Sequence, residues 1–122
     1  MKKILFLLLV TATTSCIMLQ EKGIAFKITN NSGSAITGVK IATSENLDSI
    51  TFEHIAKRDS REGFLSMKNN KTDGSYTLAF KDRDGNVKGV STGYYTNGNS
   101  LDSYIRFEIQ KDTTLVKFGE FP

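Results

Sequence analysis

The chain of 122 residues contains few of the residue types that cross-link exported domains or form metal and catalytic sites. It contains one cysteine, Cys16, one histidine, His54, one proline, Pro122, and no tryptophan. A single cysteine excludes a disulfide within the chain, and one cysteine with one histidine cannot supply the four ligands of a typical zinc site. Because the proline is the last residue, none interrupts a predicted strand.

Long apolar runs are also lacking. The longest is Ile4–Val10, which as a helix would span about 10 Å, roughly a third of a bilayer core. It is too short for a transmembrane anchor. It follows Lys2 and Lys3 and precedes the small residues Thr13–Ser15, which is the order of parts in a secretory signal peptide. We therefore predict that residues 1–15 are a signal peptide, whose removal lowers the formal charge from +3 to +1.

The only cysteine stands directly after the predicted cleavage site. The segment Thr13-Thr14-Ser15-Cys16 resembles the bacterial lipobox, in which small residues precede a cysteine that is lipidated on sulfur and becomes the new N-terminus. Thr13 stands where leucine is usual. Ordinary signal cleavage also fits these residues, but it leaves a lone exported thiol without a role. The resemblance implies a lipoprotein of the bacterial cell envelope, held by acyl chains such as palmitate at Cys16, at the outer membrane or cell surface in preference to the inner membrane.

The part of the chain after the signal peptide is the size of one domain. Residues 16–23 show no alternation and predict a tether close to the lipid, whereas residues 24–122 predict a single folded domain. Basic and acidic residues are interspersed along this domain and form no run. Nucleic acid is therefore not expected as a partner.

Apolar residues recur at every second position through the predicted domain, which is the pattern of half-buried strands. The pattern is clearest at 24–29, 76–81 and 104–109, and it is weaker at 36–43, 49–55, 63–68, 86–91 and 113–119. Regular alternation would place Ile36 and Ile41 on opposite faces of the strand. Gly38 lies between them, so a β-bulge is predicted there. The apolar faces place one group of residues in a common core, namely Phe26, Ile28, Phe52, Leu78, Phe80, Ile105, Phe107 and Ile109.

Strands that each have one apolar face must bury it against a second sheet. We therefore predict an all-β fold, a two-sheet antiparallel sandwich of about seven to eight strands, either immunoglobulin-like or transthyretin-like. The chain lacks the disulfide and tryptophan of antibody domains, and the sequence does not choose between the two topologies. Residues 55–62 could form a short helical turn.

The segment 93–100 is the most distinctive connector, because two adjacent tyrosines enter a stretch rich in glycine and asparagine. Adjacent residues of an extended chain face opposite ways, so one tyrosine is predicted to cap the core and the other to lie on the surface. Tyrosine beside asparagine also suits a contact surface. The candidate contacts with a ligand or partner are Tyr94, Tyr95, Asn97 and Asn99.

No pattern for catalysis or for a cofactor is present. His54 has no second histidine or nearby cysteine, and we interpret it as a structural or surface residue. Asp82–Asn86 superficially resembles the start of a calcium loop, but no glutamate follows at the required spacing, and Asp84-Gly85 predicts a hairpin turn instead. We expect no metal site and no catalytic residue.

Three functions remain open at this stage. The first is a non-catalytic binding or accessory domain, anchored by lipid, that recognises a protein or a glycan. The second is a structural subunit that pairs through a sheet edge within an envelope assembly. The third and weakest is a small hydrolase that uses carboxylates brought together by the fold.

Overall fold

The computed structural model describes residues 21–119, so the predicted signal peptide and Cys16 lie outside the described part. These residues form β-strands and no helix, and hence contain no helix that could cross a membrane. The strands are β1 (Gly23–Asn31), β2 (Ile36–Thr43), β3 (Ser49–Ile55), β4 (Ser60–Ser66), β5 (Gly74–Lys81), β6 (Val87–Thr96), β7 (Asn99–Ser100), β8 (Tyr104–Gln110) and β9 (Thr114–Gly119).

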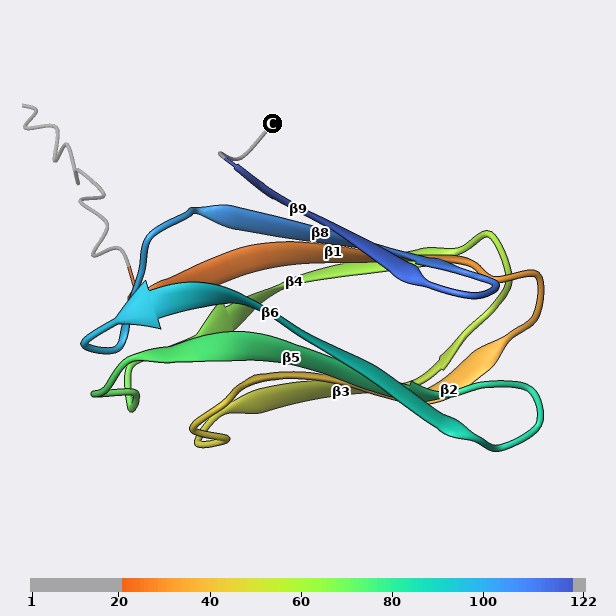
Figure 1. Cartoon of the computed structure of the whole chain (residues 1–122), viewed down its shortest axis with the longest axis horizontal. Helices are drawn as coiled ribbons and strands as arrows, with labels where there is room; N and C mark the ends of the chain where they lie inside the picture. The colour runs from red at the N-terminus through yellow and green to blue at the C-terminus, as the bar shows by residue number, and fades with distance from the viewer. Residues whose placement is uncertain (1–20, 120–122) are drawn as a thin grey trace, which may run out of the picture.

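Two sheets face each other, as Figure 1 shows, and the prediction of an all-β sandwich is confirmed. One sheet has the order β4-β1-β8-β9 and the other β3-β2-β5-β6-β7. Lettered along the chain, with the two-residue β7 left out, these orders are D-A-G-H and C-B-E-F. Immunoglobulin constant domains instead have A-B-E-D and C-F-G. The strand order therefore differs from that of the immunoglobulin alternative.

One pair of strands differs from the predicted antiparallel arrangement. β1 and β8 are parallel, with Ala25 opposite Tyr104 and Asn31 opposite Gln110, whereas all other neighbours are antiparallel. Parallel neighbours need a long crossover connection, and here the whole second sheet lies between the two strands in sequence. Alternation assigns residues to faces and carries no information on strand direction, which is why the sequence could not reveal this pair.

The predicted helical turn within residues 55–62 is wrong. The chain passes from one sheet to the other between Ile55 and Ser60, and Arg58 adopts a positive φ of 69° there. The amide of the buried Asn30 donates to the backbone oxygen of Ile55 at 3.0 Å, and the Asn30 carbonyl accepts from Arg58 N at 2.7 Å. These bonds occupy backbone groups that a helical turn would have used.

Seven of the eight predicted core residues are buried between the sheets. The prediction is wrong for Phe52, which is only half-buried because β3 is an edge strand, although its ring packs on Phe26 with 6.2 Å between centroids. The register of β2 against β5 shifts between Thr37 and Lys40, which confirms the bulge at Gly38. Large buried side chains outside the predicted core group are Tyr76, Tyr95, Leu65 and Met67.

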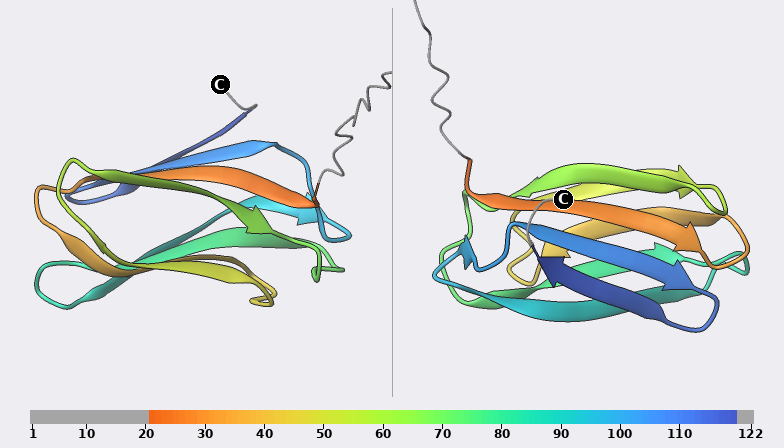
Figure 2. Two further views of the ribbon diagram at one scale, coloured as in Figure 1. Left: turned by 180° about the vertical axis from the view of Figure 1, so that it is seen from behind. Right: turned by 90° about the horizontal axis from the view of Figure 1, so that it is seen from above.

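The strand directions give the sandwich two distinct ends (Figure 2). β1 begins at Gly23 at what we call the N-terminal end, one residue before the predicted domain boundary. The connections 44–48, 67–73, 97–98 and 101–103 lie at this end. The opposite end, called the far end, carries the connections 32–35, 56–59, 82–86 and 111–113.

Candidate functional site

The segment 93–100 is a hairpin, so its prediction as a loop is wrong. β6 continues to Thr96, and Tyr95 and Thr96 pair with Ser100 and Asn99 of β7. Between them Asn97 and Gly98 both have positive φ, 49° and 74°, as in the two-residue turns that favour Asn-Gly. The sequence contains the Asn-Gly pair, but the strand predicted before it ends at residue 91, whereas β6 continues to Thr96.

The two tyrosines do face opposite ways, as predicted. Tyr95 is fully buried and its ring packs on Tyr76 with 5.5 Å between centroids, whereas Tyr94 is 52% exposed. A buried ring cannot touch a partner. Of the two aromatic candidates, Tyr94 alone offers contact area.

Both tyrosine hydroxyls hold the hairpin in place. Tyr94 donates to Asp73 at 2.9 Å, and Tyr95 donates to Glu45 at 2.8 Å. Asp73 also accepts from the backbone N of Asn97 at 3.0 Å. The bond from Asn97, followed by the bond from Tyr94, lowers the pKa of Asp73 below its ordinary value. These polar groups are therefore committed to the fold.

The remaining candidate, Asn99, has a weak local bond to the Asn97 carbonyl at 3.4 Å. It also lines a hollow at the N-terminal end, together with the chain before β1 and residues 100–103. Leu101, 62% exposed, is the only large apolar side chain of that lining. The hairpin thus offers a small polar surface beside the start of β1, and contact through 93–100 stays a prediction carried by Tyr94 and Asn99.

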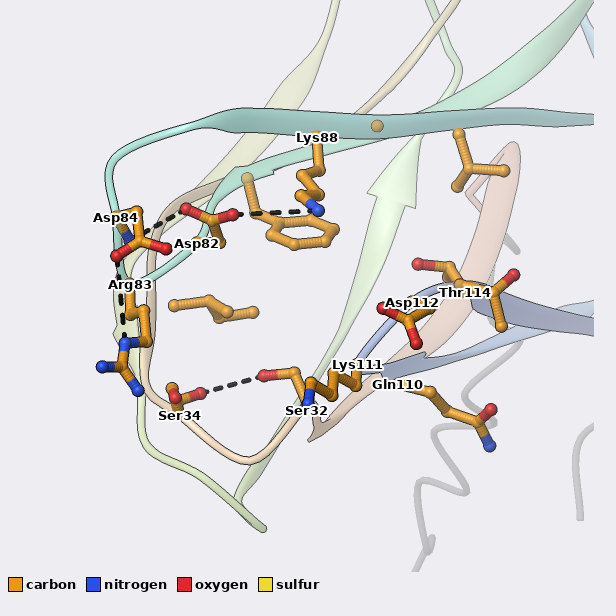
Figure 3. Close-up of a pocket in the computed structure, with 15 residues that line it drawn as sticks. Ser32, Ser34, Asp82, Arg83, Asp84, Lys88, Gln110, Lys111, Asp112 and Thr114 are labelled. Carbon is orange, nitrogen blue, oxygen red and sulfur yellow. Dashed lines mark hydrogen bonds and ion pairs between the residues drawn. The ribbon is translucent and has the colours of Figure 1, made fainter.

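A second and more enclosed concave feature lies at the far end, and sequence reasoning missed it. This far-end pocket has a volume of about 520 Å³ and is built from connections of both sheets (Figure 3). Pockets of about 300–1,000 Å³ are typical of small-molecule sites. Its walls are the β1–β2 loop, the β5–β6 turn and the β8–β9 turn, while Ile36, Phe80 and Val90 form an apolar floor. No signal in a single sequence brings three such turns together.

One wall of the far-end pocket is held by hydrogen bonds within the β5–β6 turn. Asp82 Oδ1 accepts from the backbone N of Asp84 and of Asn86, each at 2.9 Å, and Oδ2 lies 3.8 Å from Lys88 Nζ. The bond from Asn86 N is the largest cause of a lowered Asp82 pKa, despite some opposing desolvation. This geometry confirms the hairpin turn predicted at Asp84-Gly85, since Gly85 N also donates to the Asp82 carbonyl at 3.0 Å.

The opposite wall carries polar side chains that bond to no other part of the described protein. The side chains of Lys111, Asp112 and Thr114 make no hydrogen bond or ion pair with any residue between 21 and 119. Figure 3 shows Asp112 and Thr114 across the pocket from Asp82 and Lys88. These groups are available to a ligand.

The lining carries three aspartates, two lysines and one arginine, and contains neither histidine nor cysteine. Within residues 21–119 no group of three histidine, cysteine, aspartate or glutamate side chains is arranged to hold a metal ion. His54 lies exposed on β3, outside the lining. The chemistry available in the far-end pocket is hydrogen bonding over a small apolar floor.

Comparison with known proteins adds support for the fold only. No family model and no curated protein matches the chain. The chain is similar to the NMR structure of a protein from Eubacterium rectale, with a TM-score of 0.54 and 10% identity over 82% of this chain and 91% of that chain. At 10% identity, the similarity shows only that the two proteins share the arrangement of their strands.

Proposed function

We propose that the protein is a lipid-anchored, non-catalytic binding domain of the bacterial cell envelope, which binds its ligand in the far-end pocket. The observation that carries the proposal is the position of this pocket, at the end of the sandwich opposite Gly23. The lipid anchor itself rests on the lipobox resemblance at Cys16.

The length of the tether supports this arrangement. Six residues lie between Cys16 and Gly23, and at about 3.6 Å for each step along an extended chain the two residues are at most roughly 25 Å apart. A strand the length of β1 adds about 30 Å. With the acyl chains in the membrane, the N-terminal end stays near the lipid, and the far-end pocket can point away from it.

The Asp82 carboxylate of the pocket favours a binding role over hydrolysis. A general acid needs a raised pKa, so that it is protonated at neutral pH. The pKa of Asp82 is lowered by the backbone bond from Asn86, and its carboxylate is already occupied by backbone N–H groups and Lys88. We therefore propose a binding role and no catalytic residue.

The second candidate function is a structural subunit that pairs through a sheet edge. β9 is an edge strand, and the neighbouring β6 has one unpaired side except where Tyr95 and Thr96 pair with β7. Leu115 of β9 is 49% exposed. Unpaired edges can accept a strand from another molecule. Lys117 in β9 and Lys88 in β6 are the kind of residues that oppose such pairing, so we rank this function second.

Site-specific photo-crosslinking of the full chain in its native envelope tests the proposal. A photoreactive residue would replace Lys111 at the far-end pocket, Leu101 at the N-terminal end as a matched exposed control, or Leu115 on β9. We expect cross-links to an envelope component from position 111 and few from position 101. Cross-links from position 101 alone, or none from any position, would contradict the proposal, and a ladder of chain multimers from position 115 would favour the structural subunit.

A further inference from the structure

The lining of the far-end pocket also indicates the chemical class of its ligand, an inference that rests on the binding role proposed above. The floor is too small for an acyl chain or a large apolar group. Phe80 is only 5% exposed and Ile36 only 1%, so little of either side chain reaches the pocket. The floor offers a narrow apolar contact, which suits one flat face of a small ring.

The charges around the pocket cancel. Asp82, Asp84 and Asp112 face the same space as Arg83, Lys88 and Lys111. An anionic ligand would meet three carboxylates, and a cationic ligand would meet three cationic side chains, so neither charge is favoured. A hydroxyl group can donate to a carboxylate and accept from an ammonium group. A neutral ligand with many hydroxyls therefore fits both kinds of neighbour.

The polar side chains with no protein partner lie on the β8–β9 turn, exposed to solvent. The Asp82 carboxylate already accepts hydrogen bonds from two backbone N–H groups. The Ser32 hydroxyl already donates to Asn30 Oδ1 at 2.7 Å. In contrast, the Asp112 carboxylate and the Lys111 ammonium have no partner within residues 21–119. A carboxylate has two oxygens that can accept bonds from two adjacent hydroxyls. Asp112 is thus the principal polar contact offered to a ligand.

We propose that the far-end pocket binds a neutral sugar ring of an envelope glycan. The C–H face of the ring contacts the Val90 side chain and the small exposed part of Phe80. Its hydroxyl groups donate to Asp112 and accept from Lys111. This arrangement explains why an apolar floor is surrounded by equal numbers of carboxylates and cations.

Saturation-transfer NMR with the full lipidated chain in phosphocholine detergent micelles tests this ligand class. The probes are neutral disaccharides (cellobiose, maltose, lactose and N,N′-diacetylchitobiose), compared with glucuronic acid and glucosamine as charged sugars. We expect transfer to at least one neutral disaccharide, and weakening of its binding by about tenfold in D112A, since a hydrogen bond to a charged group contributes about 1.5–3 kcal/mol. The matched variant D102N, at the N-terminal end, should bind as the unchanged protein does, and both variants should keep the unfolding midpoint.

Three results would overturn the ligand class: no transfer to any neutral sugar, equal binding by D112A, or stronger binding of a charged sugar. The cross-linking experiment separates this failure from failure of the binding role. Cross-links from position 111 to a protein that neutral disaccharides do not compete with would keep the binding role and reject the sugar. Absence of both cross-links and transfer would reject both.

Discussion

The Tyr95 hydroxyl donates a 2.8 Å hydrogen bond to Oε2 of Glu45, fifty residues earlier in the chain. Glu45 follows β2 and Tyr95 is the second-last residue of β6, so the bond joins the two strands that flank β5. Glu45 Oε1 accepts from the backbone N of Lys71 at 3.2 Å. One carboxylate therefore connects three separate parts of the N-terminal end.

Replacing Tyr95 with phenylalanine tests the value of this bond. Y95F keeps the buried ring and removes the hydroxyl, so we expect a loss of about 1 kcal/mol in the free energy of unfolding, measured by urea denaturation. Y94F is the matched variant. Because the Tyr94 bond to Asp73 is exposed to water, its loss should leave the urea midpoint nearly unchanged. An equal effect of both substitutions would contradict the assignment of Tyr95 as the structural tyrosine.

The lowered carboxyl pKa values predict acid destabilisation. The pKa is below its ordinary value for Glu45, Asp59, Asp73, Asp82 and Glu108. A folded pKa below the unfolded one stabilises the fold above the unfolded value of about 4, and this stabilisation is lost as pH falls through the folded pKa. The urea midpoint should thus be flat from pH 7 to about pH 5 and fall below about pH 4. D73N should reduce the slope at acidic pH, and an unchanged slope would contradict the role given to Asp73.

Phe107 tests the location of the core. Its side chain has no exposed surface, and it lies at the centre of β8 between β1 and β9. F107A should lower the free energy of unfolding by about 3–5 kcal/mol, because it leaves a cavity that the sheets cannot close. F64A, at a position that is 42% exposed, should cost well under half as much. A loss below about 1 kcal/mol in F107A would show that this face is not the core.

Gly98 and Gly85 form a matched pair for the hairpin turns. Both have positive φ, 74° and 83°, a conformation that costs other residues about 1–2 kcal/mol. A Cβ at Gly85 would meet nothing within 4 Å, whereas one at Gly98 would clash with the backbone of Asn70. G98A should therefore be clearly more destabilising than G85A in thermal unfolding. Equal effects would mean that the hairpin is not seated on the 67–73 loop.

Cys16 carries the prediction of the lipid anchor. Intact-mass spectrometry of the mature protein should show an N-terminus at Cys16 with added acyl mass, and C16S should abolish membrane retention. An unmodified thiol, or an N-terminus elsewhere, would contradict the anchor. The far-end pocket would remain a candidate site, but the proposed orientation toward a membrane would be lost.

The sequence by itself determined the fold class and most of the core. Alternation with period two assigned Phe26, Leu78 and Phe107 to buried faces, because successive side chains of a strand point to opposite sides whatever the partner strand is. It also predicted that Tyr94 and Tyr95 face opposite ways, and the Asp84-Gly85 pair predicted the turn between β5 and β6. These results depend on local geometry alone.

Only the tertiary structure decided the topology and the candidate site. The parallel pairing of β1 with β8, and the half-exposure of Phe52 on an edge strand, depend on which strands become neighbours. The far-end pocket joins turns near residues 32, 84 and 112, which are far apart in the chain. No local pattern encodes that meeting, because it follows from the way two twisted sheets pack and bring their connections to a common end.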